Sequence, residues 1–236
     1  MHLVMFDIDG TLTETMKVDG ECFVRSFMDV FGFGDIDTDW SHYRHTTDSG
    51  ILHDVYASRT GRPSTEQDVS RFQQHFIQLL TAASSRSPFT SVAGAAQLLS
   101  RLSSSSTHRV SLATGGWRDS ARLKMTSAGM CFDSYPAASA DDALDRESIM
   151  RLSMQRAAER YGEMFARIVY VRDGVWDARA CRGLGIPFIG VASGVRAARL
   201  ASEGAVRVFQ DLSESDLFLE SLHEIVDEAV FVGGSP

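Results

Sequence analysis

Short apolar runs alternate with helix-like periods through most of the chain. The runs cover residues 3–8, 109–113, 168–171, 186–191 and 206–209, and a doubtful sixth lies near Tyr135. Each run is nearly continuous in apolar residues, as in parallel strands that are covered on both faces. Between the runs, apolar positions recur at helical spacing, for example at residues 150, 154, 157 and 161. From about residue 90 onward, this alternation predicts a doubly wound, mostly parallel α/β sheet.

Residues 15–89 break the pattern, because they contain helical segments and no convincing strand. One apolar face contains Phe23 and Phe27, and a second contains Phe72 and Phe76. The second segment follows a capping-box spacing at residues 64 and 67. A strand-to-helix loop usually has about 2–6 residues, so this stretch is too long for a connector. We therefore predict a core of residues 1–14 and 90–236, with an inserted α-helical cap of residues 15–89 over the carboxyl ends of the strands.

Composition limits the classes of partner. Of 236 residues, 44% are hydrophobic and 23% charged, which is typical of a globular protein. The 23 Lys and Arg against 31 Asp and Glu give a net charge of −8, which argues against nucleic acid as a partner. No apolar run approaches the ~20 residues of a membrane span. Three cysteines without a CxxC pair, and a first segment without a basic n-region, predict a reduced cytoplasmic protein. A monomer and a homodimer both stay open.

The first apolar run ends in two carboxylates, Asp7 and Asp9. Burying two like charges beside a covered strand is costly unless a cation or protons offset them. An ordinary turn accounts for one Asp and for Gly10, but not for both acids next to the strand. The segment is therefore the strongest candidate for chemistry.

This segment, Asp7-Ile8-Asp9-Gly10-Thr11-Leu12, resembles the DxDGT(L/V) motif of the haloacid dehalogenase-like superfamily. The chain is similar to its phosphatase branch with a helical cap, which includes phosphoglycolate phosphatases. The resemblance implies that Asp7 attacks phosphorus and becomes an aspartyl phosphate. It implies that Asp9 protonates the leaving oxygen and then deprotonates water. Gly10 and Thr11 would turn the backbone so that amides reach the phosphate.

The second strand ends in Thr114, followed by Gly115 and Gly116. Alone, this turn is an ordinary helix start. It occupies the place of the family's second motif, which implies that Thr114 binds the transferring phosphoryl group and that Gly115 belongs to the phosphate loop.

A third strand ends in Asp173, with Asp177 four residues further on. The resemblance implies that Asp173 completes a Mg²⁺ site with Asp7 and the main-chain carbonyl of Asp9, since Mg²⁺ prefers oxygen ligands. Asp177 either orients a cation or a metal-bound water, or complements the dipole of the following helix.

The chain departs from the family pattern at two positions. Arg172 stands where Gly is usual. It could repel Mg²⁺ or reach the substrate's phosphate, but strand alternation places it opposite Asp173 and favours a harmless outward position. The family's phosphate-facing cation is usually a Lys, yet lysine occurs only at positions 17 and 124. Arg146 stands at the expected place, so we predict Arg146 first and Lys124 second, with a plain surface Arg146 as the alternative.

Together these features predict a Mg²⁺-dependent phosphatase for a small phosphorylated metabolite. A phosphomutase of the same superfamily and a catalytically weak phosphate-binding protein remain as alternatives. In the predicted cap, the polar loop of residues 43–50 contains Arg44, His45 and Thr47 as candidates for contact with the leaving group.

Overall fold

The computed structural model describes the backbone of residues 1–232 and the side chains of residues 1–225. Within these residues, six parallel strands form one sheet in the order β3-β2-β1-β4-β5-β6. The strands are β1 (His2–Phe6), β2 (His108–Ala113), β3 (Ala137–Ala138), β4 (Arg167–Arg172), β5 (Phe188–Val191) and β6 (Arg207–Phe209). This order confirms the predicted doubly wound α/β fold.

The strands follow the apolar runs because both faces of the sheet are covered. In β1, Val4 and Phe6 belong to one hydrophobic cluster and Met5 belongs to another. A strand that packs on both sides needs apolar residues at successive positions rather than at every second one. The doubtful run near Tyr135 is the two-residue strand β3.

Helices cover each face. On one face, the first cluster includes side chains from α4, α5 and α9. On the other face, the second cluster includes side chains from α6, α7 and α8. Their bounds are α4 (Ala95–Ser103), α5 (Arg118–Ser127), α6 (Arg146–Tyr161), α7 (Ala178–Leu184), α8 (Gly194–Ser202) and α9 (Ser215–Val232), and a 3-10 turn, η2, spans Phe132–Ser134.

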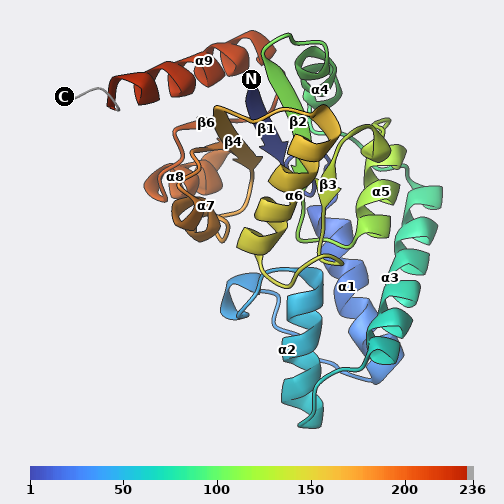
Figure 1. The fold of residues 1–236 in the computed structure, drawn as a ribbon. Helices are drawn as coiled ribbons and strands as arrows, with labels where there is room; N and C mark the ends of the chain where they lie inside the picture. The colour runs from blue at the N-terminus through green and yellow to red at the C-terminus, as the bar shows by residue number, and fades with distance from the viewer. Residues whose placement is uncertain (233–236) are drawn as a thin grey trace.

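The helical insertion lies between β1 and α4. It contains α1 (Met16–Phe31), the 3-10 turn η1 (Trp40–His42), α2 (Asp48–Thr60) and α3 (Glu66–Arg86). Figure 1 shows these helices below the sheet, beyond the carboxyl ends of its strands. The two connections to the sheet run side by side, since Thr13 and Ser91 form an isolated antiparallel bridge. The bridge lies next to the predicted boundaries between core and cap, at residues 14 and 90. The division into two domains stays a prediction.

The start of α3 differs from the prediction by one residue. Thr65, not Ser64, is the N-cap, and it forms a capping box with Asp68. The Ser64 hydroxyl instead bonds to the His53 ring in α2. The sequence contains two overlapping capping-box spacings, at residues 64 and 67 and at residues 65 and 68. The prediction at residues 64 and 67 is wrong, because the second spacing forms the cap.

A third hydrophobic cluster joins the insertion to the sheet. Phe23, Phe27, Phe72 and Phe76 pack with Trp117, which directly precedes α5. The ring centroids of Phe27 and Phe72 are 4.6 Å apart, and those of Phe72 and Trp117 are 5.8 Å apart. The insertion therefore shares buried aromatic surface with the connection that leads from β2 into α5.

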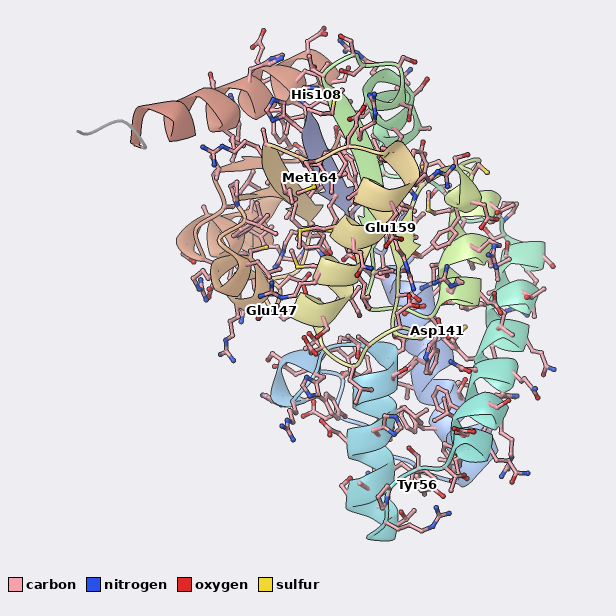
Figure 2. All side chains as sticks on the ribbon, in the orientation of Figure 1. Tyr56, His108, Asp141, Glu147, Glu159 and Met164 are labelled. Carbon is pink, nitrogen blue, oxygen red and sulfur yellow. The ribbon has the colours of Figure 1, made fainter. Side chains whose placement is uncertain are left out.

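The boundary between the sheet and the insertion crosses the middle of the molecule (Figure 2). Figure 2 shows Tyr56 near the far end of the insertion, His108 at the opposite end of the molecule, and Glu147 between them at the start of α6. Among the residues that the structure describes, no helix combines the length and apolar character needed to cross a membrane.

We expect Phe72→Ala to lower the free energy of unfolding by about 3–5 kcal/mol, because Phe72 is fully buried and its loss leaves a cavity. Phe165→Ala is the matched control, since Phe165 is only partly buried; its cost should stay below about 2 kcal/mol. Urea unfolding followed by circular dichroism measures both. Equal costs would contradict the shared aromatic cluster as a main source of stability.

Candidate active site

The strand order places the site where the sheet changes direction. β2 and β3 lie on one side of β1, and β4, β5 and β6 lie on the other. In open α/β sheets, ligands bind at such a switch point, outside the carboxyl ends of the strands. A cavity opens there, lined by Asp7, Thr114 and Asp173 from the sheet and by Asp19 and Asp48 from the insertion.

The loop after β1 is a tight turn that presents Asp7. The Asp7 amide donates to the Val171 carbonyl of β4 at 2.9 Å, so the residue is anchored at the sheet edge. The amides of Leu12 and Thr13 both donate to the Ile8 carbonyl, which closes the turn. Gly10 has φ +75°, and a Cβ there would lie 2.2 Å from Asp173 Oδ2. Glycine thus leaves room for Asp173 to approach the turn.

Asp7 and Asp173 are both buried, with exposed fractions of 5% and 4%. Burial raises the pKa of Asp7 to about 6. Burial, reinforced by repulsion from Asp7, raises the pKa of Asp173 to about 8. Two carboxylates that penalise each other's charge favour a bound cation.

The predicted Mg²⁺ ligands fit this arrangement. Among the described residues no cluster of three or more His, Cys, Asp or Glu side chains forms a metal centre. The predicted set needs only two carboxylates, Asp7 and Asp173, with the Asp9 main-chain carbonyl as a third oxygen. The only cation paired with Asp173 in the described part of the chain is Arg196, at 3.4 Å, and its side chain is 59% exposed. Buried hard oxygens next to a displaceable surface arginine suit a divalent ion that keeps several waters.

Thr114 ends β2 with its side chain in the cavity wall. Its hydroxyl oxygen accepts from the Gly116 amide at 3.1 Å, which leaves the O–H free to donate to an anion. The next amides are occupied by protein acceptors: Trp117 donates to Asp48 Oδ2 at 3.0 Å, and Arg118 donates to Asp141 Oδ2 at 2.6 Å. The start of α5 therefore offers an anion fewer amides than a free helix end would.

Arg146, at the start of α6, reaches Asp7. Its Nη1 lies 3.5 Å from Asp7 Oδ1, and its Nε donates to the Thr46 carbonyl of the insertion at 3.0 Å. Nη1 is buried and makes no hydrogen bond within the described residues, so one donor remains available beside Asp7. The guanidinium packs on Gly115, where a Cβ would lie 2.3 Å from Nη2. A side chain at position 115 would therefore displace the guanidinium.

Lys124, the second predicted cation, lies beside Asp9 instead. It is fully buried, its Nζ donates to Asp9 Oδ2 at 2.8 Å, and it also pairs with Asp19 of α1. Asp9 Oδ1 accepts from the Thr15 hydroxyl at 2.5 Å. Burial opposes the charge on Lys124, but Asp19 and Asp9 outweigh it and raise the pKa of the amine above its ordinary value. Both cations of the prediction thus lie in the site, at different carboxylates.

Arg172 does not point outward, so that expectation is wrong. It is 0% exposed, and its guanidinium lies 5.1 Å over the Phe188 ring of β5. The alternation rule places it opposite Val171, but helices cover that face too, so the opposite face is also buried. Its partner is Asp177, at 3.7 Å, whose own side chain makes no cap bond to α7. Asp177 also lies 3.2 Å from Arg146, so it contacts two guanidinium groups.

The loop of residues 43–50 contributes to the site unevenly. Thr46 and Thr47 line the cavity, whereas Arg44 and His45 line a neighbouring groove. Thr47 is the N-cap of α2 and donates to the Leu144 carbonyl at 2.6 Å. Its hydroxyl therefore stabilises the start of α2 and contacts the loop before α6, in addition to lining the cavity.

Sequence reasoning missed two acids of the insertion, Asp19 and Asp48. Each is in the first turn of a helix and reads locally as a residue that complements the helix dipole. The one sequence feature that could have indicated them is Lys124, which shares a face of α5 with the buried Ala121 and Met125. A lysine on a buried helix face needs carboxylate partners, so it indicates that acids lie nearby.

A family model described as haloacid dehalogenase-like hydrolase matches residues 1–185. This span contains Asp7, Thr114, Arg146 and Asp173.

The chain belongs to the haloacid dehalogenase-like hydrolases.

Solved structures share the fold of this hydrolase at low identity. A hydrolase from Pseudomonas syringae has a TM-score of 0.72 and 19% identity, and the match covers 95% of this chain and 99% of that one. CbbY from Rhodobacter sphaeroides, solved with phosphate, has a TM-score of 0.68 and 18% identity, covering 90% and 95%. A proposed β-phosphoglucomutase from Bacteroides vulgatus has a TM-score of 0.69 and 20% identity, covering 96% and 90%. No curated protein matches the sequence.

We expect Gly115→Ala to weaken binding of inorganic phosphate to this hydrolase by about 10–100-fold, because the new methyl group pushes the Arg146 guanidinium away from Asp7. Gly116→Ala is the control, since its Cβ would meet only atoms at 3.5 Å or beyond. Calorimetric titration with phosphate measures both variants. Equal affinities would show that Arg146 does not contact the anion.

Proposed function

We propose that this hydrolase is a Mg²⁺-dependent phosphatase that acts on a small phosphorylated metabolite through an aspartyl-phosphate intermediate. One observation carries the proposal: Asp7, a buried carboxylate, repels the charge of a second buried carboxylate, Asp173, and lies 3.5 Å from Arg146 Nη1, a donor without a hydrogen-bond partner in the described part of the chain. The pair of carboxylates suits a metal, and the arginine donor suits a phosphoryl oxygen.

In the first step, an Asp7 oxygen attacks phosphorus and the ester bond breaks, so that the leaving oxygen takes a proton from Asp9. In the second step, water attacks the phosphorus of aspartyl phosphate, its proton passes to Asp9, and Asp7 is released. Arg146 and the Thr114 hydroxyl hold the phosphoryl oxygens in both steps. Asp7, Asp173 and the Asp9 carbonyl would hold Mg²⁺, which offsets the negative charge that builds on those oxygens.

The contacts of Asp9 suit the second step. Lys124 and the Thr15 hydroxyl each donate to one oxygen of the carboxylate. These two donors fix the orientation of the carboxyl group that receives the proton of water in the second step. For the first step, Asp9 has to leave these donors and carry a proton to the leaving oxygen.

The acidic composition of the cavity also bears on the substrate. Its wall includes Asp19 and Asp48 beside Trp40, so the leaving group faces carboxylates and an aromatic ring rather than a basic surface. A single small phosphate ester suits this wall better than a polyanion.

Asp7→Asn keeps the size of the side chain and removes the nucleophile, so we expect phosphate release from an aryl phosphate to fall by at least about 10³-fold while circular dichroism stays unchanged. Asp216→Asn is the control, because the Asp216 side chain is 86% exposed. A panel of phosphorylated metabolites then identifies the substrate. Turnover by the Asp7→Asn variant at the original rate would refute the nucleophile, and an isomeric sugar phosphate as product would indicate a mutase.

The raised pKa values predict how Mg²⁺ affinity depends on pH. A metal binds the ionised carboxylates, and Asp173, with its pKa raised to about 8 in the metal-free protein, holds a proton below that pH. We expect the affinity to fall by up to about tenfold for each pH unit from 8 to 6. Calorimetry of Mg²⁺ binding at pH 6 and pH 8 measures the difference, and equal affinities would contradict the assignment of Asp173 as a ligand.

The same shift acts on stability with the opposite sign. Between pH 4 and pH 8 the folded, metal-free protein holds a proton on Asp173 that the unfolded chain has lost. The free energy of unfolding without metal should therefore fall as pH rises through this range. Asp173→Asn should make that slope less steep, chiefly between pH 6 and pH 8, because Asp7 and Asp19, whose pKa values are raised to about 6, contribute below that range. Urea unfolding at several pH values measures the slope of both proteins.

A further inference from the structure

A row of alternating charges runs from the interior of the sheet to Asp7. Arg172 ends β4 and Asp177 precedes α7, and both are 0% exposed. Arg172 Nη1 lies 3.7 Å from Asp177 Oδ2. Asp177 Oδ1 lies 3.2 Å from Arg146 Nε, and Arg146 Nη1 lies 3.5 Å from Asp7 Oδ1.

The inner half of this row depends on charge rather than on neutral hydrogen bonds. Within the described residues, none of the Arg172 guanidinium nitrogens and neither Asp177 oxygen has a hydrogen-bond partner that meets ordinary geometry. The Phe188 ring and the Cys181 thiol also lie near Arg172, but they compensate a buried cation only weakly. The charge of Arg172 also acts on the Asp173 carboxyl, yet its only ion pair among the described residues is with Asp177. The Asp177 carboxylate therefore offsets most of the Arg172 charge, and Arg172 in turn offsets part of the Asp177 charge.

Asp177 and Asp7 compete for Arg146. Both carboxylates are buried, and Asp177 is the nearer, at 3.2 Å against 3.5 Å. With Arg146 as its only cation, Asp177 would draw the guanidinium inward and away from Asp7. Because Arg172 shares the Asp177 charge, Arg146 keeps charge beside Asp7, where its Nη1 has no hydrogen-bond partner within the described residues.

We infer that Arg172 is a positioning residue: through Asp177 it holds the Arg146 guanidinium beside Asp7. The expected changes in kcat and KM rest on the proposed function, whereas the expected position of the Arg146 side chain does not. Arg172 has no ion pair with Asp7 and does not line the cavity, and its only ion pair in the described part of the chain is with Asp177.

The first test is Arg172→Met, which keeps an unbranched side chain over Phe188 and removes the charge. In its crystal structure we expect Arg146 to move from Asp7 toward Asp177, and calorimetry should show about 10–100-fold weaker binding of inorganic phosphate. With an aryl phosphate, kcat should fall and KM should rise. Arg172→Lys should recover part of each loss, because it keeps the charge.

Arg182→Met is the matched control. Arg182 lies in α7 and pairs with Glu203 on the surface, with its side chain 57% exposed. This variant removes the same charge near the same helix without touching Asp177, and we expect phosphate binding and kinetics like those of the parent protein.

A double-variant comparison covers the case in which Arg172→Met does not fold. If Arg172 acts only through Asp177, adding Arg172→Met to Asp177→Asn should leave phosphate affinity and kcat unchanged within about twofold. A further loss in that background would overturn the inference, as would an Arg172→Met structure with Arg146 still at Asp7.

The outcomes separate this inference from the proposed function. If the parent protein releases no phosphate from any ester, the phosphatase assignment fails, and the position of Arg146 in the Arg172→Met crystal structure still decides the role of Arg172. If the parent protein is active and Arg172→Met matches it in phosphate affinity and kcat, the positioning role fails and the phosphatase assignment stands.

Discussion

The burial of acidic oxygens at one edge of the sheet is the constraint on which this site depends. Asp7 follows β1, Asp173 follows β4 and Asp177 precedes α7, and all three have almost no exposure to water. A buried carboxylate is tolerated only where a cation, a proton or good hydrogen bonds offset its charge. Arg146 pairs with Asp7 and Asp177, Arg172 pairs with Asp177, and the exposed Arg196 pairs with Asp173. In the proposed function, a metal ion and a phosphoryl group would offset the remaining repulsion between Asp7 and Asp173.

The same need for charge balance joins the helical insertion to the sheet. Lys124 in α5 pairs with Asp9 of the β1 loop and with Asp19 of α1. Asp48 of α2 accepts the Trp117 amide, and the Thr46 carbonyl accepts from Arg146. These polar contacts surround the cavity, whereas the aromatic cluster around Phe72 and Trp117 supplies apolar contact beside it. Thr15 at the start of the insertion donates to Asp9, and Asp19 shares Lys124 with it, so a shift of the insertion relative to the sheet would change the contacts of Asp9.

The sequence predicted what depends on local pattern and missed what depends on long-range contact. Apolar runs located the strands, because a strand covered on both faces needs continuous apolar residues. The motif at Asp7 and the strand ends at Thr114 and Asp173 located the cavity, since parallel strands end at one edge. The N-cap of α3 was misplaced by one residue because Ser64 and Thr65 both offer a hydroxyl, and only the contact between Ser64 and His53 separates them. The burial of Arg172 was missed because alternation gives the face of a residue but not what covers that face.

The two departures from the family pattern, Arg146 and Arg172, make physical sense as one unit. A lysine ammonium is a point charge, whereas the planar guanidinium of Arg146 spreads its donors over several directions. It uses them to reach Asp7, Asp177 and the Thr46 carbonyl together. The Arg146 guanidinium can turn toward Asp7 or toward Asp177. A further charged residue is therefore needed to favour one of these orientations. A glycine at position 172 would leave the Asp177 charge to be offset by Arg146 alone. The buried Arg172 offsets part of that charge, and the structure combines this ion pair with an Arg146 donor that stays without a hydrogen-bond partner beside Asp7 among the described residues.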